Sequence, residues 1–322
     1  MTPADGVVVV RGLKKRYGAL TAVDDVSFAI PEGQVFGLLG PNGAGKTSTL
    51  EMIEGLRVPD AGEIFVQGID ARRHPAKIKA IIGVQLQNSS YFDLLTVRET
   101  LGLFGSLFPV HLPEHALIPR FELAEKADTR VKDLSGGQRQ RLSVALALVN
   151  DPRVVFLDEP SAGLDPQARR ILWETIASFR EEGRTVVLTT HYMDEAEFLS
   201  DDLVIMDHGR IIAHGTPREL VRRYLPGAVI ELDRPAGQRI GDLKLEALRR
   251  AEERENLWTL ESDRLEDTLV DLVQWSRERS VPLEGLRTRG ATLEDVFLEL
   301  TGRSLREDNG EARPSEGRER RG

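Results

Sequence analysis

The sequence predicts an α/β fold with a parallel sheet and a phosphate-binding loop, and three stretches carry this prediction. The first is GPNGAGKT at 40–47, which lies between an apolar run and a segment of helical character. The others, VVFLD at 154–158 and TVVLTT at 185–190, are apolar runs without polar alternation, as expected for strands buried on both faces. A glycine loop between a strand and a helix binds phosphate, so the fold class already indicates a nucleotide site.

Composition limits the protein classes. The 322 residues suggest about two domains, and a net charge of −9 argues against a general nucleic-acid binder. Cysteine is absent, which favours a reducing cytoplasm. The N-terminus has no basic region followed by a long apolar segment, and no apolar run is long enough to span a bilayer. We therefore expect a cytoplasmic protein that needs another chain to act on a membrane.

The chain begins with two expected strands, at 7–11 and 25–30. We expect the basic segment KKRYG at 14–18 to form a turn between them. Tyr17 precedes the phosphate loop, where its ring can stack on an adenine or lie half-buried in a strand; the residue alone does not decide between these.

The phosphate loop supplies the first group of candidate ligands. Its glycines free backbone N–H groups, Lys46 can reach the β- and γ-phosphates, and the Thr47 hydroxyl can ligate Mg²⁺. A chance glycine-rich turn is the alternative, and the flanking strand and the helix expected at 48–54 argue against it. The candidate ATP-binding residues here are Gly40, Pro41, Asn42, Gly43, Ala44, Gly45, Lys46, Thr47 and Ser48.

A strand at 81–87 ends in Gln87, and the carboxyl ends of such strands are where α/β sheets bind ligands. A solvated loop glutamine is the alternative. Apolar residues at helical spacing predict a helix over 96–108, and prolines at 109, 113 and 119 follow. We expect a helical insertion at about 90–150.

The motif LSGGQ at 134–138 opens a second predicted helix. Ser135 is an expected N-cap, and capping does not require the two glycines that follow it. Free N–H groups in this first turn predict a second anion site, formed by Ser135, Gly136, Gly137 and Gln138.

Two carboxylates end the strand at 154–158. Asp158 can hold Mg²⁺, and Glu159 can polarise a water in line with the γ-phosphate; acidic residues in this place are otherwise usually structural. His191 ends the strand at 185–190, where it can contact the γ-phosphate, and Asp165 precedes the proline that starts another helix.

These motifs, in this order, resemble the ATPase subunit of ABC transporters over about the first 220 residues. The resemblance implies a P-loop NTPase fold with a mixed sheet core and a helical subdomain, within a domain at 1–225. It implies ATP and Mg²⁺ as cofactors, with Thr47, Gln87 and Asp158 at the metal and Glu159, His191 and Gln87 as catalytic residues. It also implies a head-to-tail homodimer in which Ser135–Gln138 of one copy close over the ATP of the other, with Asp165 linking the sites. Tyr17 matches the adenine-stacking aromatic, and Gln87 would also touch a transmembrane permease.

The remaining third predicts a small α/β domain at 226–302, with strands at 228–232 and 257–260 and helices at 264–279 and 293–300. The alternative is an appended domain whose role is packing alone. The segment TLEDVFLELTGRSLRE is similar to the C-terminal motif of daunorubicin-resistance exporters of the ABC-2 type, which implies a dimer-stabilising or regulatory role. Residues 303–322 are charged and almost free of apolar side chains, so we expect disorder.

The expected function is a Mg²⁺-dependent ATPase on the cytoplasmic face of the membrane, powering a separate ABC-2 permease that exports a drug, lipid or polysaccharide. Nucleic acid is not an expected partner. A soluble ABC protein acting on ribosomes or DNA is the rival, but it usually has two cassettes or a long coiled coil, and this chain has one phosphate loop and no heptads. A nucleotide sensor without hydrolysis is disfavoured by Glu159 and His191.

Overall fold

The computed structural model describes residues 6–87, 91–225, 227–243, 245–254 and 256–302. These residues form two compact units, one ending at Pro217 and the other beginning at Arg218. Helix α8 (Pro217–Tyr224) lies at this boundary, so the boundary predicted at 225 falls just after it. The predicted disordered tail at 303–322 lies outside the described residues.

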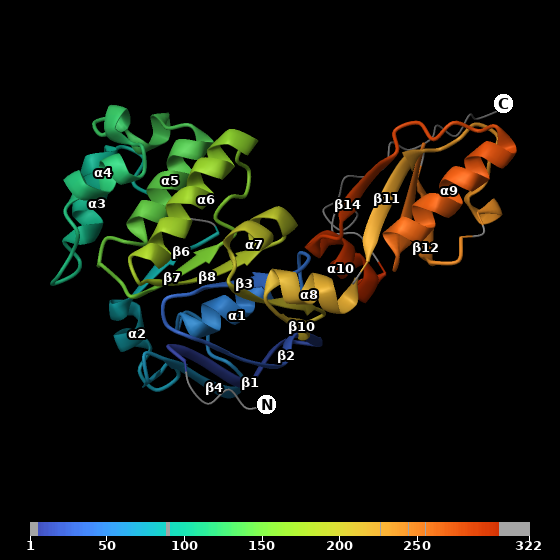
Figure 1. The fold of residues 1–322 in the computed structure, drawn as a ribbon. Coiled ribbons are helices and arrows are strands. Elements are labelled where there is room, and N and C mark those ends of the chain that lie inside the picture. Colours follow the sequence, from blue (N-terminus) through green and yellow to red (C-terminus); the bar gives the residue numbers. More distant parts are fainter. Residues whose placement is uncertain (1–5, 88–90, 226, 244, 255, 303–322) are drawn as a thin grey trace, which may run out of the picture. The chain divides into compact units, whose positions relative to one another are not determined.

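The first unit is built on a mostly parallel six-stranded sheet (Figure 1). Its strand order is β10 (Arg210–Gly215), β9 (Asp202–Asp207), β3 (Val35–Leu39), β8 (Thr185–Thr190), β7 (Val154–Asp158) and β6 (Ile82–Gln85), with only β10 antiparallel. Along β7, Val154 and Phe156 enter one core while Val155 and Leu157 enter another. This burial on both faces explains why the sequence of β7 lacks polar alternation.

A second sheet covers one face of the first. It is antiparallel, in the order β2 (Leu20–Ile30), β1 (Val8–Tyr17), β4 (Ala61–Val66) and β5 (Ile69–Asp70). Side chains of β1, β2 and β4 share a core with α1 (Lys46–Ile53) and the six-stranded sheet. The mixed sheet core expected for the fold is confirmed.

The predicted turn at 14–18 is wrong, because β1 continues through Tyr17. Its basic side chains are accommodated by acidic partners on both sides: Lys14 Nζ lies 3.0 Å from Asp24 on β2, and Lys15 Nζ lies 3.0 Å from Asp60, just before β4. Both basic side chains of this run are therefore paired with acidic ones while the backbone continues as a strand.

Helices pack against the other face of the six-stranded sheet (Figure 1). The predicted helix at 96–108 is α3 (Val97–Gly105), which begins with a capping box between Thr96 and Glu99. Pro113 then precedes α4 (Glu114–Arg120), and the predicted insertion ends with α5 (Gly136–Leu146). Three further helices complete the unit: α2 (Pro75–Ile81), α6 (Pro166–Glu181) and α7 (Met193–Leu199).

The second unit contains an antiparallel sheet, ordered β12 (Leu248–Arg254), β13 (Leu257–Ser262), β11 (Ala228–Asp233) and β14 (Arg287–Gly290), with α9 (Leu265–Arg279) and α10 (Leu293–Thr301). Its core contains Trp258 and Trp275, whose rings are 6.0 Å apart. The two central strands were predicted; the charged edge strands β12 and β14 were not. None of the helices in the described residues is long and apolar enough to cross a membrane.

Candidate functional site

The loop between β3 and α1 has the close packing that a phosphate cradle needs. Gly45 has a left-handed backbone (φ 98°), and a Cβ there would lie 2.3 Å from the Ala22 carbonyl oxygen. At Gly40 a Cβ would lie 2.2 Å from the carbonyl oxygen of Met206. A Cβ at Gly43 would meet no atom within 4 Å, so the loop faces open space on that side. Glycine is therefore required at 40 and 45 so that the backbone N–H groups of the loop and of the start of α1 can surround an anion.

Lys46 places its ammonium group inside this loop. Nζ donates hydrogen bonds to the carbonyl oxygens of Gly40 (2.7 Å) and Pro41 (3.0 Å), and the side chain is 4% exposed. Burial lowers the pKa of Lys46, while the carboxyl groups of Glu159 and Asp158 oppose that shift. A phosphate entering the loop would thus meet a preplaced cation and the positive end of the α1 dipole.

Thr47 and Asp158 meet at the end of β7. The Thr47 hydroxyl donates to Asp158 Oδ1 at 3.2 Å, and the Thr189 hydroxyl donates to the same oxygen. Burial raises the pKa of Asp158, and the two hydroxyl donors counteract that rise. A hydroxyl and a carboxylate beside a phosphate loop are the oxygen ligands that Mg²⁺ takes when it is shared with nucleotide phosphates, so this donor set fits the ion.

Glu159 follows Asp158 with a strained backbone. Its φ of 50° is uncommon for a residue other than glycine, and its N–H is held by the carbonyl and hydroxyl oxygens of Thr189 at 3.1 and 3.0 Å. Its carboxylate lies 3.7 Å from Lys46 Nζ and 3.4 Å from Gln87 Nε2. His191 Nδ1 is 3.2 Å away, without the alignment of a hydrogen bond.

The surroundings of Glu159 set its charge. Burial acts to raise its pKa, but the nearby His191 ring, Lys46 and Gln87 outweigh burial and hold the pKa below its usual value. Glu159 is therefore a carboxylate at neutral pH, the form that accepts a proton from water. The structure thus brings together Lys46, Thr47, Gln87, Asp158, Glu159 and His191 at one sheet edge.

Tyr17 lies beside this cluster. Its hydroxyl is 3.4 Å from Ser48 Oγ at the start of α1, and the side chain is 38% exposed. The Arg57 guanidinium lies 5.2 Å from the ring centroid. The ring is thus accessible next to the phosphate loop, and adenine stacking stays a prediction.

Two other predicted groups lie at helix starts. Ser135 is the N-cap of α5, and it forms a capping box with Gln138 through bonds of 3.0 and 3.3 Å; Gly136 and Gly137 follow on the accessible first turn. Asp165 caps α6 by accepting from the N–H groups of Gln167 and Ala168. Their capping roles are observed, while their roles toward a second copy stay predictions.

Sequence reasoning missed two supporting residues. Thr189, which binds both Asp158 and the Glu159 backbone, was detectable as a hydroxyl at the end of an apolar strand. Gln140 on α5 donates to the Pro160 carbonyl at 2.6 Å and so ties the helix after LSGGQ to the residue after Glu159. A single sequence gives no signal for this second contact, because the two residues are brought together only by the fold.

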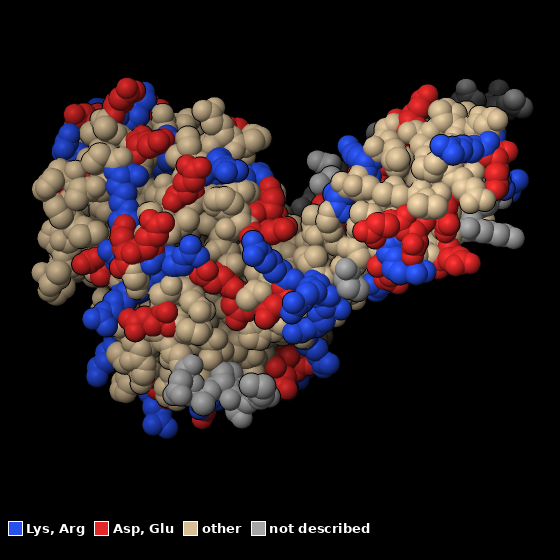
Figure 2. Space-filling view, in the orientation of Figure 1, with Lys and Arg blue, Asp and Glu red and all other residues tan. Residues whose placement is uncertain are grey.

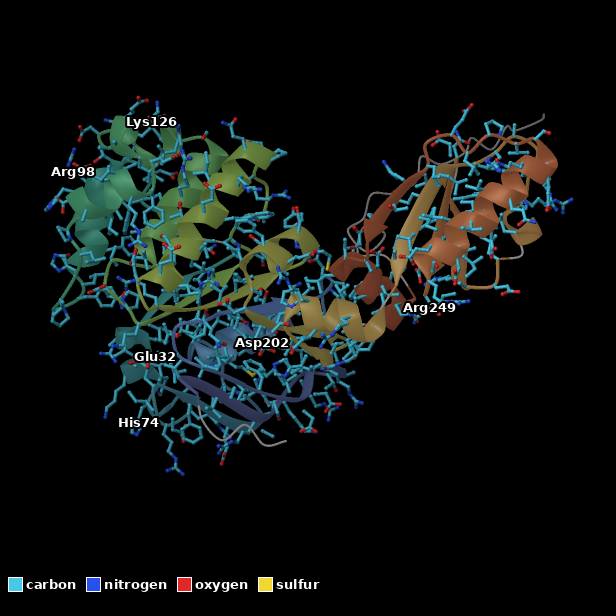
Figure 3. The ribbon with its side chains drawn as sticks, viewed as in Figure 1. Glu32, His74, Arg98, Lys126, Asp202 and Arg249 are labelled. Carbon is cyan, nitrogen blue, oxygen red and sulfur yellow. The ribbon has the colours of Figure 1, made fainter. Side chains whose placement is uncertain are left out.

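The remaining histidines lie apart from the cluster around Glu159. His214 pairs with Asp202 at 2.8 Å, and His74 lies at the surface (Figure 3). In the part of the chain that the structure describes, no three His, Cys, Asp or Glu side chains gather so as to hold a metal ion. A Mg²⁺ ion at Thr47 and Asp158 would therefore depend on phosphate oxygens for further ligands.

Comparison with known proteins agrees with this geometry. The ABC transporter family matches residues 23–162. The Nod factor export ATP-binding protein I of Ralstonia nicotianae is 42% identical over 313 residues, which cover 94% of this chain and 95% of that protein. The protein of the same description from Rhizobium sp. (strain N33) is 40% identical, with 91% and 96% covered.

Solved structures extend the similarity to three dimensions. An ATP-binding subunit of an ABC transporter superposes with a TM-score of 0.61 at 28% identity, covering 67% of this chain and 92% of that one. A dimeric ATP-binding cassette in a post-hydrolysis state, bound to ADP and Pi, gives a TM-score of 0.60 at 26% identity, covering 65% and 98%.

Proposed function

This chain belongs to the ABC transporter family as an ATPase subunit of the ABC-2 exporter type, and we propose that it hydrolyses Mg²⁺-bound ATP as a homodimer that drives a separate membrane permease. The cluster around Glu159 is the observation that carries this proposal. A carboxylate held between Lys46, Gln87 and His191 can take a proton from an attacking water beside the phosphate loop.

The roles of the remaining residues follow from their places. Lys46 and the loop N–H groups would bind the phosphates, and Tyr17 would stack on the adenine. Thr47, Asp158 and Gln87 are the residues that would hold Mg²⁺. When Mg²⁺ is bound, it neutralises charge on the phosphates. His191 contacts the γ-phosphate and positions Glu159.

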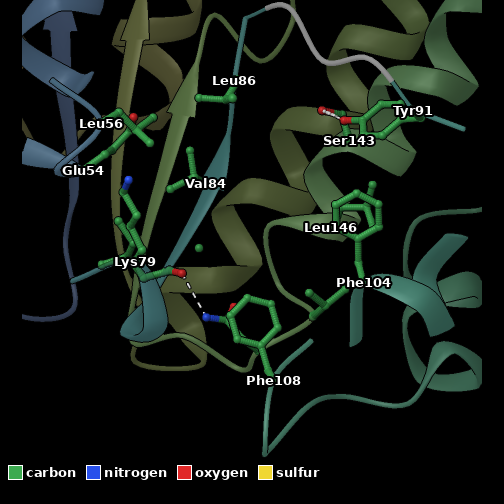
Figure 4. A pocket seen from close by; sticks show the side chains of 14 residues that line it. Glu54, Leu56, Lys79, Val84, Leu86, Tyr91, Phe104, Phe108, Ser143 and Leu146 are labelled. Atoms are coloured by element: carbon green, nitrogen blue, oxygen red, sulfur yellow. Dashed lines mark hydrogen bonds between the residues drawn. The ribbon is translucent and has the colours of Figure 1, made fainter. Parts of the chain in front are cut away.

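The permease docks in a cavity beside this site. The cavity, with a volume of about 370 Å³, lies between the end of α1, β6 and helices α3 and α5 (Figure 4). We call it the β6 cavity; its apolar lining includes Leu56, Val84, Leu86, Tyr91, Phe104 and Phe108. Leu86 is the neighbour of Gln87, whose amide contacts Glu159, so one short segment connects the cavity with the reacting centre.

Dimerisation completes the site. Ser135 and the glycines after it present an accessible helix start, and the dimeric state of a similar cassette supports its use against a second copy's nucleotide. Asp165, at the start of α6, would contact the partner between the two sites.

Export is the proposed direction, because both relatives reported above are described as export proteins. A drug, lipid or polysaccharide is the proposed cargo class, and the cytoplasmic face of the membrane is the proposed location. Lys and Arg are interspersed with Asp and Glu on the face seen in Figure 2, which does not favour nucleic acid as a partner.

The proposal is tested by isolating the tagged full-length chain from detergent-solubilised membranes of its own cells. We expect an ABC-2 type permease to co-purify, and we expect ATP hydrolysis by the complex in vesicles to require Mg²⁺. Co-purification with ribosomes or DNA, with hydrolysis unaffected by any membrane protein, would instead support the rival function.

A further inference from the structure

Glu54 is a buried acidic residue at the end of α1. It follows the last residue of α1, is 1% exposed, and lines the β6 cavity (Figure 4). Neither carboxyl oxygen has a hydrogen-bond partner among the described residues. A buried carboxyl group without a hydrogen-bond partner is costly, so its presence in a cavity lined mainly by apolar residues calls for a reason.

Among the residues that the structure describes, none forms an ion pair with Glu54. Burial raises the pKa of Glu54 to about 8, and the two charged groups that reinforce the shift, Asp158 and Glu51, are both acidic. Lys79 lines the same cavity, but its side chain is exposed and it forms no ion pair with Glu54 in the described structure. The unmet requirement at Glu54 is therefore for a hydrogen-bond donor, preferably a positively charged one.

We propose that Glu54 receives a lysine or arginine side chain from the permease segment that docks in the β6 cavity. This inference rests on the proposed function and adds the chemistry of the partner: apolar side chains against Leu56, Phe104 and Phe108, with one basic group among them. Lysine has three N–H donors and arginine has five, so either side chain can donate to both carboxyl oxygens of Glu54. A purely apolar segment would leave these oxygens unpaired. A segment with an acidic residue at that place would be rejected by repulsion, so Glu54 is a specificity determinant.

The docked segment is identified first. A benzoylphenylalanine at position 108 of the full-length chain, replacing one aromatic lining residue by another, is photo-crosslinked to the permease captured by the wild-type chain. Mass spectrometry then identifies the crosslinked segment. We expect it to contain a lysine or arginine within one helical turn of the crosslinked residue; a segment without either overturns the proposal.

The pairing is then tested by a double-mutant cycle on permease affinity. Glu54→Gln, which keeps the shape of the side chain, and substitution of the permease cation by glutamine should each weaken binding about tenfold, and the two together should weaken it no further. If the double variant instead weakens permease binding by the product of the two single effects, the two groups do not interact. Thermal melts of each variant establish that it is folded.

Two controls separate the remaining possibilities. Glu51→Gln, one turn earlier on α1, should leave permease affinity unchanged. If Lys79→Met reproduces the effect of Glu54→Gln, the carboxyl is neutralised within this chain and the proposal is wrong. Failure of the wild-type chain to capture any permease contradicts the proposed function itself, whereas equal capture by wild type and Glu54→Gln contradicts only this inference.

Discussion

At the scale of single residues, the site contains two buried carboxyl groups whose pKa values are shifted in opposite directions by their surroundings. Glu159 is kept ionised by His191, Lys46 and Gln87, whereas Glu54 is kept protonated by its burial, which the acidic groups of Asp158 and Glu51 reinforce. The two groups are thereby suited to different tasks: Glu159 can accept a proton from water, and Glu54 can pair with a basic side chain of a partner protein.

Glu159→Gln tests the first task. The amide preserves the shape of the side chain but cannot accept a proton, so we expect ATP affinity to be retained and turnover to fall by about 10²- to 10⁴-fold. Phosphate release and nucleotide binding by the same preparation measure the two effects. The surface variant Glu32→Gln should behave like wild type, and full hydrolysis by Glu159→Gln would remove Glu159 from its proposed role.

Glu54 gives a stability prediction whose sign follows from its pKa. The folded-state value of about 8 exceeds the ordinary 4.5, so between these pH values the folded chain binds more protons than the unfolded chain. The contribution of Glu54 to stability is therefore fully present below about pH 4.5 and is lost as the pH rises to about 8.

Glu54→Gln removes this titration. Relative to the variant, wild type should lose on the order of 2–4 kcal/mol of unfolding free energy between pH 5 and pH 8. Urea unfolding of both proteins at several pH values measures the difference, and Glu125→Gln on the surface serves as the control. Parallel pH profiles for wild type and Glu54→Gln would show that Glu54 ionises normally.

At the scale of secondary-structure elements, three helices begin with the same capping motif. Thr96, Ser135 and Thr292 each form a capping box with the side chain three residues later, at the starts of α3, α5 and α10. In α10 the box is extended, because Asp295 also pairs with Arg289 at the end of β14. The cap therefore also links the helix to the edge of its sheet.

Thr292→Ala should destabilise the second unit by about 1 kcal/mol, because the Asp295 N–H in the first turn of α10 loses the hydroxyl oxygen that accepts its hydrogen bond. Hydrogen exchange in the full-length chain measures this as faster exchange of the α10 amides, with the amides of α5 unaffected. Thr288→Ala, an exposed threonine on β14, is the matched control. Equal effects of the two substitutions would assign the loss to threonine removal in general.

The elements also show what a single sequence reveals. Strands β7 and β8 were predictable because burial on both faces gives each of them an uninterrupted apolar run, and Asp158, Glu159 and His191 could be placed at their ends. Edge strands β12 and β14 were missed, since a strand with one open edge can consist mainly of charged residues. The turn proposed at 14–18 was wrong because the partners of Lys14 and Lys15 are supplied by Asp24 and Asp60, which pattern reasoning does not pair.

At the scale of the whole molecule, the two helix starts that are predicted to bind anions belong to different parts of the first unit. The loop before α1 lies at the sheet edge, whereas Ser135 begins a helix of the insertion. Lys46 Nζ lies 3.7 Å from the Glu159 carboxylate, while the side-chain hydrogen bond of Ser135 stays within its own capping box. We therefore expect Ser135 to act on the nucleotide of a second copy.

Dimerisation in Glu159→Gln tests this arrangement, because slow turnover should leave ATP trapped between two copies. We expect this variant to sediment as a dimer with ATP and Mg²⁺ and as a monomer without them. Adding Ser135→Ala should abolish the dimer, since the second nucleotide contact is lost. The matched control adds Thr96→Ala instead, which removes an equivalent capping box from the same insertion and costs a similar ~1 kcal/mol of helix stability. If Thr96→Ala and Ser135→Ala weaken the dimer equally, the effect comes from helix stability. If neither substitution weakens the dimer, and wild type hydrolyses ATP at full speed as a monomer, Ser135 has no role across the interface.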